Sequence, residues 1–76
     1  MATLTEEKLG EVQQEVLNVL EEPEPGSMIF NGLVVLVAAR TGVSLEVVRG
    51  AISLLENKDL VAVTRSRYEP WIVQAV

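Results

Sequence analysis

The spacing of apolar residues at the start of the chain predicts a helix over residues 5–22. Apolar side chains recur there every three or four positions with polar residues between them, as on a helix that buries one face. These positions are Leu9, Val12, Val16, Val19 and Leu20. Thr5 is the expected N-cap, and two prolines and a glycine within residues 23–26 are expected to end the helix.

After this segment the pattern changes several times. The expected elements are a short strand over residues 28–30, a helix over 31–40, a helix over 44–57 and a hairpin over 60–76. Asn31 and Ser44 are the expected N-caps of the two helices, and Gly42 between them suits the left-handed backbone of a tight turn. The hairpin combines two runs rich in β-formers with a polar loop over residues 66–69.

The second predicted helix is apolar on every side. Residues 32–39 contain no polar side chain, and a helix of this kind usually has all of its faces covered. If Val34, Val37 and Ala38 face the core, the outer face is a candidate protein interface. Its residues are Val35, Leu36 and Ala39, to which we add Leu17 and Leu54. A different helical register, or a strand formed by this β-branched run, would remove that interface.

Composition limits the chemistry open to this chain. It has 76 residues, enough for one small domain, and contains neither Cys nor His. Zinc, iron–sulfur and blue-copper sites therefore lose their usual ligands, and thiol nucleophiles and His-based triads are excluded. No glycine-rich loop of the phosphate-binding type is present. We expect no enzymatic activity, no cofactor and no metal.

The chain is apolar for its size. Apolar residues make up 49% of it, and the mean hydropathy is +0.31. The longest uncharged run, residues 25–39, contains Pro, Gly, Ser and Asn and is shorter than the roughly 20 apolar residues of a membrane span. The first residues also lack the basic start and apolar stretch of a signal peptide. We expect a cytoplasmic protein, with no membrane segment, whose apolar surface meets a protein partner or a second copy.

Residues 37–44, Val-Ala-Ala-Arg-Thr-Gly-Val-Ser, resemble the first half of a helix-turn-helix. The small residue Ala38 would pack against the crossing helix, and Gly42, four positions later, would make the turn. Apolar residues follow at the spacings where winged helix-turn-helix domains bury such residues, at Val48, Ala51, Ile52, Leu55 and Leu60. The resemblance covers residues 27–76, with one departure at Asp59, where the family commonly has Gly.

This resemblance implies a single α+β (mainly α) domain over residues 1–76, a winged helix-turn-helix with three helices plus a C-terminal two- or three-stranded β wing. It also implies binding of double-stranded DNA, with the third helix in the major groove and the wing on the backbone. The base-reading candidates are Ser44, Leu45, Glu46, Arg49 and Ser53. The wing candidates are Thr64, Arg65, Ser66, Arg67 and Tyr68.

Charge is distributed unevenly along the chain and limits DNA binding. The net charge is −5; residues 1–25 hold 7 acids and one Lys, net −6, and residues 26–76 hold 5 bases and 4 acids, net +1. Because so few cations neutralise few phosphates, we expect DNA binding to need a homodimer. Arg65 and Arg67 could instead belong to an ordinary solvated turn, and Glu46 could simply favour the positive end of its helix.

Two functions remain open from the sequence. The first is a small DNA-binding homodimer that regulates transcription, which the arginines of the expected wing favour. The second is an acidic winged-helix module for protein–protein interaction, a scaffold or adaptor that uses the exposed apolar face of the second helix. The net charge of −5 and the outward-facing Val35 and Leu36 favour this second function.

Overall fold

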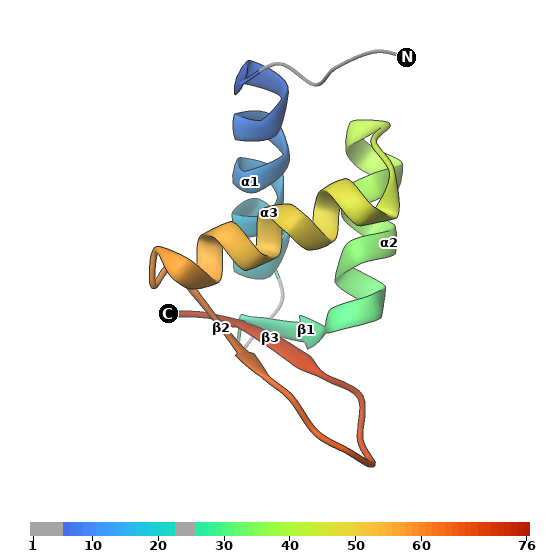
Figure 1. Cartoon of the computed structure of the whole chain (residues 1–76), viewed down its shortest axis with the longest axis vertical. Coiled ribbons are helices and arrows are strands. Elements are labelled where there is room, and N and C mark those ends of the chain that lie inside the picture. Colours follow the sequence, from blue (N-terminus) through green and yellow to red (C-terminus); the bar gives the residue numbers. More distant parts are fainter. Residues whose placement is uncertain (1–5, 23–25) are drawn as a thin grey trace.

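The computed structural model describes residues 6–22 and 26–76, which form three helices and one small antiparallel sheet (Figure 1). In chain order the elements are α1 (Glu6–Glu21), β1 (Ser27–Ile29), α2 (Phe30–Thr41), α3 (Leu45–Asn57), β2 (Val61–Thr64) and β3 (Ile72–Ala75). The predicted fold class, α+β and mainly α, is confirmed. The expected cap Thr5 and the prolines at 23 and 25 lie outside the described residues.

Helix α1 buries the face that its periodicity predicts. Val12, Val16, Val19 and Leu20 are all buried, while Leu9 at the edge of the stripe is half-buried. Two glutamates, Glu6 and Glu7, occupy the first turn, where a negative charge is favourable next to the positive end of the helix dipole. The remaining glutamates of α1 give the helix an acidic outer side.

Helix α2 begins one residue earlier than predicted, and Asn31 does not cap it. Its N-cap is Ile29, which makes no side-chain capping hydrogen bond. The reason is non-local: Ile29 is paired with Ile72 in the sheet, and the N–H of Phe30 donates to the carbonyl of Trp71 at 2.7 Å. The neighbouring strand therefore accepts from one of the N–H groups at the start of the helix that have no partner within it. The β-branched run inside α2 forms a helix, so a strand there is wrong.

The turn between α2 and α3 follows the prediction. Gly42 has φ 75°, in the left-handed region, and its N–H donates to the carbonyl of Ala38 at 2.9 Å. The hydroxyl of Ser44 accepts from the N–H of Val47 at 3.3 Å and so caps α3. The hydroxyl of Thr41 donates back to the carbonyl of Val37 at 2.7 Å.

The three strands are ordered β1-β3-β2, with β3 antiparallel to both neighbours. Leu60, predicted to be buried, is instead 45% exposed, and Val61 takes the buried position at 2% exposure. The chain reverses just before, where Asp59 has φ 60° and the N–H of Leu60 donates to the carbonyl of Leu55 at 3.0 Å. Asp59 is the position noted in the sequence as a departure from a common Gly, and its backbone adopts the left-handed conformation that Asp tolerates better than most residues.

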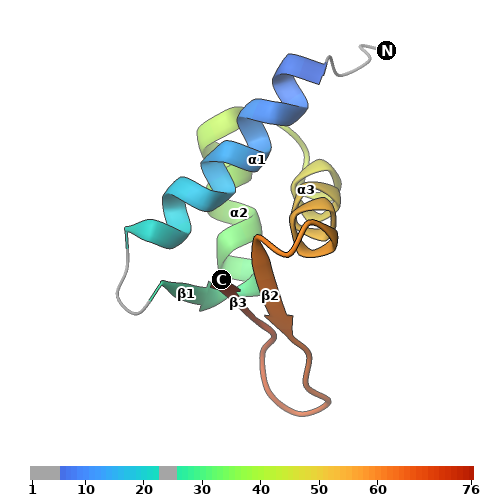
Figure 2. The same ribbon diagram turned by 90° about the vertical axis from the view of Figure 1, so that its left-hand side faces the viewer.

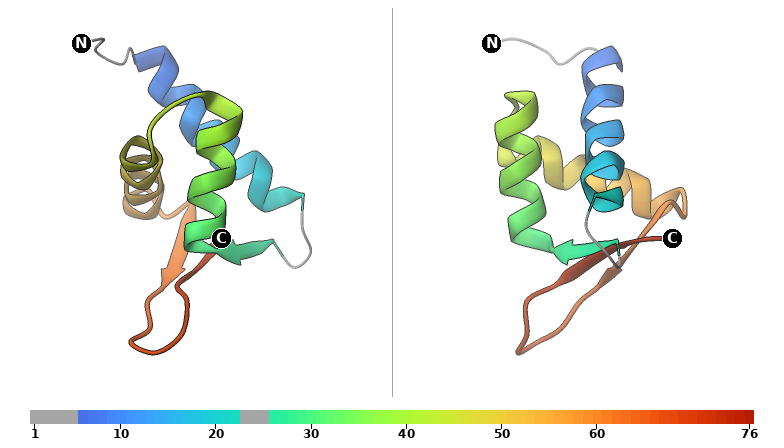
Figure 3. Two further views of the ribbon diagram at one scale, coloured as in Figure 1. Left: turned by 90° about the vertical axis from the view of Figure 1, so that its right-hand side faces the viewer. Right: turned by 180° about the vertical axis from the view of Figure 1, so that it is seen from behind.

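All three helices and the sheet contribute to one apolar core. Helix α3 crosses both α1 and α2, and the hairpin of β2 and β3 extends beyond the helices (Figures 1, 2 and 3). The buried residues are Val12, Val16, Val19, Leu20, Leu33, Val34, Val37, Val48, Ala51, Ile52, Leu55, Val61 and Val73. Among the described residues no single helix is long and apolar enough to cross a membrane, and the one pair that passes together, α2 with α3, is bent by 113°.

Candidate nucleic-acid interface

The exposed side of α3 carries the residues predicted to read bases. Its inner side is formed by Val48, Ala51, Ile52 and Leu55, all buried in the core. Glu46, Arg49 and Ser53 lie on the surface, and Leu45 at the start of the helix is 43% exposed. Ser44 also has a structural role, because its hydroxyl caps the helix. The face is therefore accessible, with one cation and one carboxylate among its predicted contacts.

The hairpin loop contains residues predicted to contact the DNA backbone, and Ser66 accepts the hydrogen bonds that hold this loop together. The hydroxyl of Ser66 accepts from the N–H groups of Tyr68 and Glu69 at 3.4 and 3.2 Å. Its carbonyl accepts from the indole Nε1 of Trp71 at 3.1 Å. Arg67 lies exposed in this loop, and Tyr68 is 91% exposed, so its ring is open to a ligand.

The guanidinium of Arg65 already contacts other side chains of the protein. Its guanidinium donates to both carboxylate oxygens of Glu56 at 2.8 and 2.9 Å, and its Cζ lies 5.2 Å from the centroid of the Trp71 ring. This hydrogen bonding raises the pKa of Arg65 and lowers the pKa of the Glu56 carboxyl. The pair joins the hairpin to α3 and neutralises a cation that was predicted to contact phosphate. No sequence signal pointed to Glu56, because the pairing depends on the angle at which the hairpin leaves α3.

Two other basic residues are also engaged. Nη1 of Arg40 lies 3.2 Å from a carboxylate oxygen of Glu15 and 3.2 Å from one of Glu22, which ties the end of α2 to α1 and raises the pKa of Arg40, with Glu22 the larger cause. Nζ of Lys58 donates to Oε1 of Gln13 at 3.4 Å. Within residues 6–22 and 26–76, Arg49 and Arg67 are left without an ion pair or a hydrogen bond from their side chains.

The face made by α3 and the hairpin has no net charge, whereas α1 is strongly acidic. The charged residues of this face are Glu46, Arg49, Glu56, Arg65, Arg67 and Glu69. Three arginines against three glutamates sum to zero. Helix α1 carries glutamates 6, 7, 11, 15 and 21 with a single lysine, and it packs against the buried side of α3 (Figure 2). The acidic helix is therefore kept away from the exposed side of α3.

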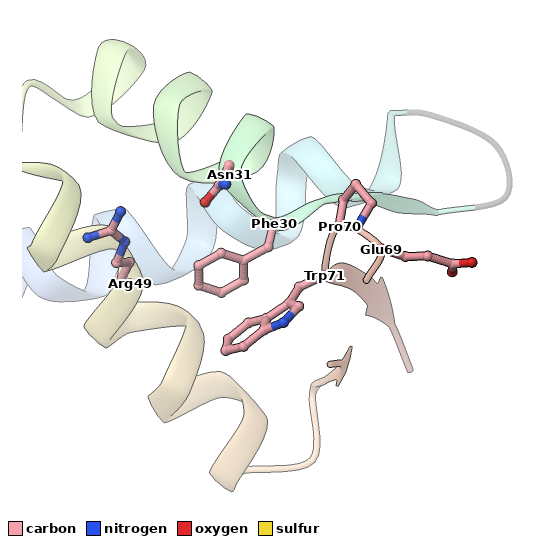
Figure 4. Close-up of a pocket in the computed structure, with 6 residues that line it drawn as sticks. All are labelled: Phe30, Asn31, Arg49, Glu69, Pro70 and Trp71. Atoms are coloured by element: carbon pink, nitrogen blue, oxygen red, sulfur yellow. The ribbon is translucent and has the colours of Figure 1, made fainter. Parts of the chain in front are cut away.

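A groove of about 470 Å³ lies between α2, α3 and the hairpin. Its lining residues are Phe30, Asn31, Arg49, Glu69, Pro70 and Trp71 (Figure 4). The rings of Phe30 and Trp71 meet edge to face, with centroids 5.7 Å apart and an interplanar angle of 70°. Of these six residues, only Arg49 was a predicted site residue. Phe30 and Asn31 were missed because the strand pairing that places them beside Trp71 joins distant parts of the chain.

The candidate protein interface on α2 is smaller than predicted. Val35 is 57% exposed and Ala39 is exposed, as the chosen register requires. Leu36 and Leu17, however, are half-buried and pack against the core. Leu54 is 44% exposed and belongs to α3. The outer face of α2 thus consists of one larger apolar side chain with small and polar neighbours.

Comparison with protein-family models, with curated proteins and with solved structures found no match. Across the part of the chain that the structure describes, no cluster of three or more carboxylates could hold a metal ion.

Proposed function

We propose that this chain is a winged helix-turn-helix protein that binds double-stranded DNA as a homodimer and regulates transcription in the cytoplasm. The element order supports this family, as does the left-handed turn at Gly42 between α2 and α3. The observation that carries the proposal is the arrangement of charge. Arg49 on the exposed side of α3 and Arg67 in the adjoining hairpin loop have no partner in the described residues, and the acidic α1 lies behind α3.

In this proposal α3 enters the major groove and the hairpin acts as the wing. The guanidinium of Arg49 would donate to the two acceptors of a guanine, and Glu46 would accept from the amino group of a cytosine. Arg67 and Tyr68 would contact the backbone beside the groove. On the α3–hairpin face, within residues 6–22 and 26–76, only Arg49 and Arg67 are cations without a carboxylate partner. Two such cations give weak binding, so a second copy is needed to bring the phosphate contacts to a useful number.

The experiment is a titration of the purified protein with mixed-sequence duplex DNA between roughly 50 and 200 mM salt, with the molar mass measured in the same buffers. We expect a dimer whose affinity falls steeply as salt rises. Arg67→Gln should reduce the salt slope by about 1 for every sequence, and Arg49→Gln should cost about 1–3 kcal/mol and relax specificity. Lys58→Gln, which removes an exposed charge outside this face, is the control. Absence of binding at the lowest salt would contradict the proposal.

The balanced charge of the α3–hairpin face favours a second candidate, a protein-interaction module. Under it, a partner covers the outer face of α2, where Val35 is 57% exposed. Val35→Glu should then abolish self-association or partner binding while the fold persists, because this side chain is outside the core. Asn31→Glu adds the same charge to the same helix and is its control. Unchanged molar mass and partner binding in V35E would exclude this candidate.

A further inference from the structure

The groove between α2, α3 and the hairpin combines two kinds of wall. Phe30, Trp71 and Pro70 form an apolar side, and Trp71 is 40% exposed although its ring already meets Phe30 and Arg65. In Figure 4 Arg49 stands on α3 on the same side of the groove as Phe30, with its guanidinium turned upward in the view and away from Trp71, and the Asn31 amide lies above the rings. The Glu69 carboxylate points away from the rings in the same view.

These walls define the chemistry of a ligand. Aromatic side chains offer faces and edges to a planar ring, and such contacts are tolerant of which ring is bound. The Arg49 guanidinium, which has no partner within the described part of the chain, favours an anion, and its fork geometry matches phosphate. A carboxamide can donate and accept at once, which suits the edge of a nucleobase such as adenine. A volume of about 470 Å³ is within the roughly 300–1,000 Å³ of small-ligand sites.

We propose that this groove binds a single nucleotide, with its base against Phe30 and Trp71, its phosphate at the Arg49 guanidinium and its base edge at the Asn31 amide. The nucleotide has two possible sources: a free mononucleotide, or an unpaired nucleotide in a DNA strand. The second source rests on the proposed function, because the groove adjoins the face assigned to DNA. A base in an intact duplex is stacked on its neighbours and cannot enter, so the groove would favour single strands and overhangs.

The test uses two probes, deoxyadenosine 5′-monophosphate and a short single strand of deoxyadenosine nucleotides, with a blunt duplex titrated in parallel. Trp71 is the only tryptophan, so its fluorescence reports on the groove directly. Its indole N–H, which donates to the Ser66 carbonyl, provides an independent NMR signal. Saturable changes with both probes identify a mononucleotide site, and changes with the strand alone identify a site for an unpaired nucleotide. No change in either signal at millimolar probe would overturn the inference.

Variants separate the groove from general electrostatics. Arg49→Gln should weaken binding of the responding probe about tenfold, as expected for loss of a charge-assisted hydrogen bond. Asn31→Ala, at an exposed position, should also weaken it and should keep the fold. Lys58→Gln removes the same charge as Arg49→Gln from outside the groove and should change the affinity less than twofold. Equal losses in R49Q and K58Q would contradict a specific site.

The same titrations distinguish this inference from the proposed function. Binding of the blunt duplex without a Trp71 response to either probe would leave the DNA proposal standing and reject the nucleotide site. A response to the mononucleotide, without duplex binding at low salt, would establish the groove and reject the DNA proposal.

Discussion

At the scale of single residues, the arginines of this protein divide by their partners. Arg40 and Arg65 hold elements together through glutamates, whereas Arg49 and Arg67 face solvent. The side chains of Arg65 and Glu56 remain 49% and 30% exposed, so a competing phosphate could reach the pair. Glu56 therefore competes with any anion near the hairpin for the guanidinium of Arg65.

Removing the charge of Glu56 should strengthen DNA binding. In Glu56→Gln the Arg65 guanidinium loses its carboxylate partner and becomes available to phosphate. We expect a several-fold higher affinity for duplex DNA and a salt slope steeper by about 1. The control is Glu15→Gln, which removes a carboxylate that contacts Arg40 on α1, away from the hairpin. Equal changes in both variants would indicate a general effect of net charge.

The same pair makes a predictable contribution to stability against pH. The hydrogen bonds from Arg65 lower the pKa of Glu56 from the ordinary 4.5. A carboxyl with a lowered pKa in the folded state stabilises the protein fully above the unfolded value and loses this effect as pH falls through the folded value. The melting temperature of the natural protein should therefore fall below about pH 4.5 more steeply than that of Glu56→Gln. Parallel curves for the two proteins would show that the pair is not formed in solution.

At the scale of elements, the local sequence pattern determines the helices and their caps, whereas long-range strand pairing determines where the elements meet. The apolar periodicity of α1 and α3, the Ser44 cap and the Gly42 turn depend on neighbours in sequence, so they could be predicted. The start of α2, the exposure of Leu60 and the partner of Arg65 depend on how the sheet meets the helices. Those features require the register of β1 and β2 against β3, which no short window of sequence contains.

Two exposed glycines should respond oppositely to the same change. Gly42 has φ 75°, and an added Cβ would meet nothing within 4 Å. The only cost of Gly42→Ala is therefore the left-handed backbone conformation, which should destabilise the protein by about 1 kcal/mol. Gly50 lies inside α3 with equally free space, so Gly50→Ala should stabilise it by roughly 0.5–1 kcal/mol. Urea denaturation of both variants tests this, and a loss of stability in G50A would mean that α3 is not helical at that point.

At the scale of the whole molecule, one small core supports both the α3–hairpin face and the groove. It contains only apolar residues and no disulfide, since the chain has no Cys. A domain of this length buries a modest fraction of its surface, and its stability is correspondingly limited. The α3–hairpin face and the groove therefore depend on a few buried valines, leucines and isoleucines.

A single cavity in that core should lower the free energy of unfolding substantially. Leu33→Ala removes a side chain with 0% exposure and should cost about 2–5 kcal/mol of the free energy of unfolding. Leu54→Ala makes the same chemical change at a position 44% exposed and should cost much less. The denaturation midpoints of the two variants give the comparison. Equal losses would place Leu54 in a buried contact, such as an interface between copies.

The strand order β1-β3-β2 also has a consequence during synthesis on the ribosome. The central strand, β3, is made after the other five elements of the described residues, and both neighbouring strands pair only with it there. All three helices are complete by residue 57, yet no strand pair can form until residues 72–75 have left the exit tunnel. Until then Val73 is missing from the core, and the nascent helices expose the apolar surface that it later covers.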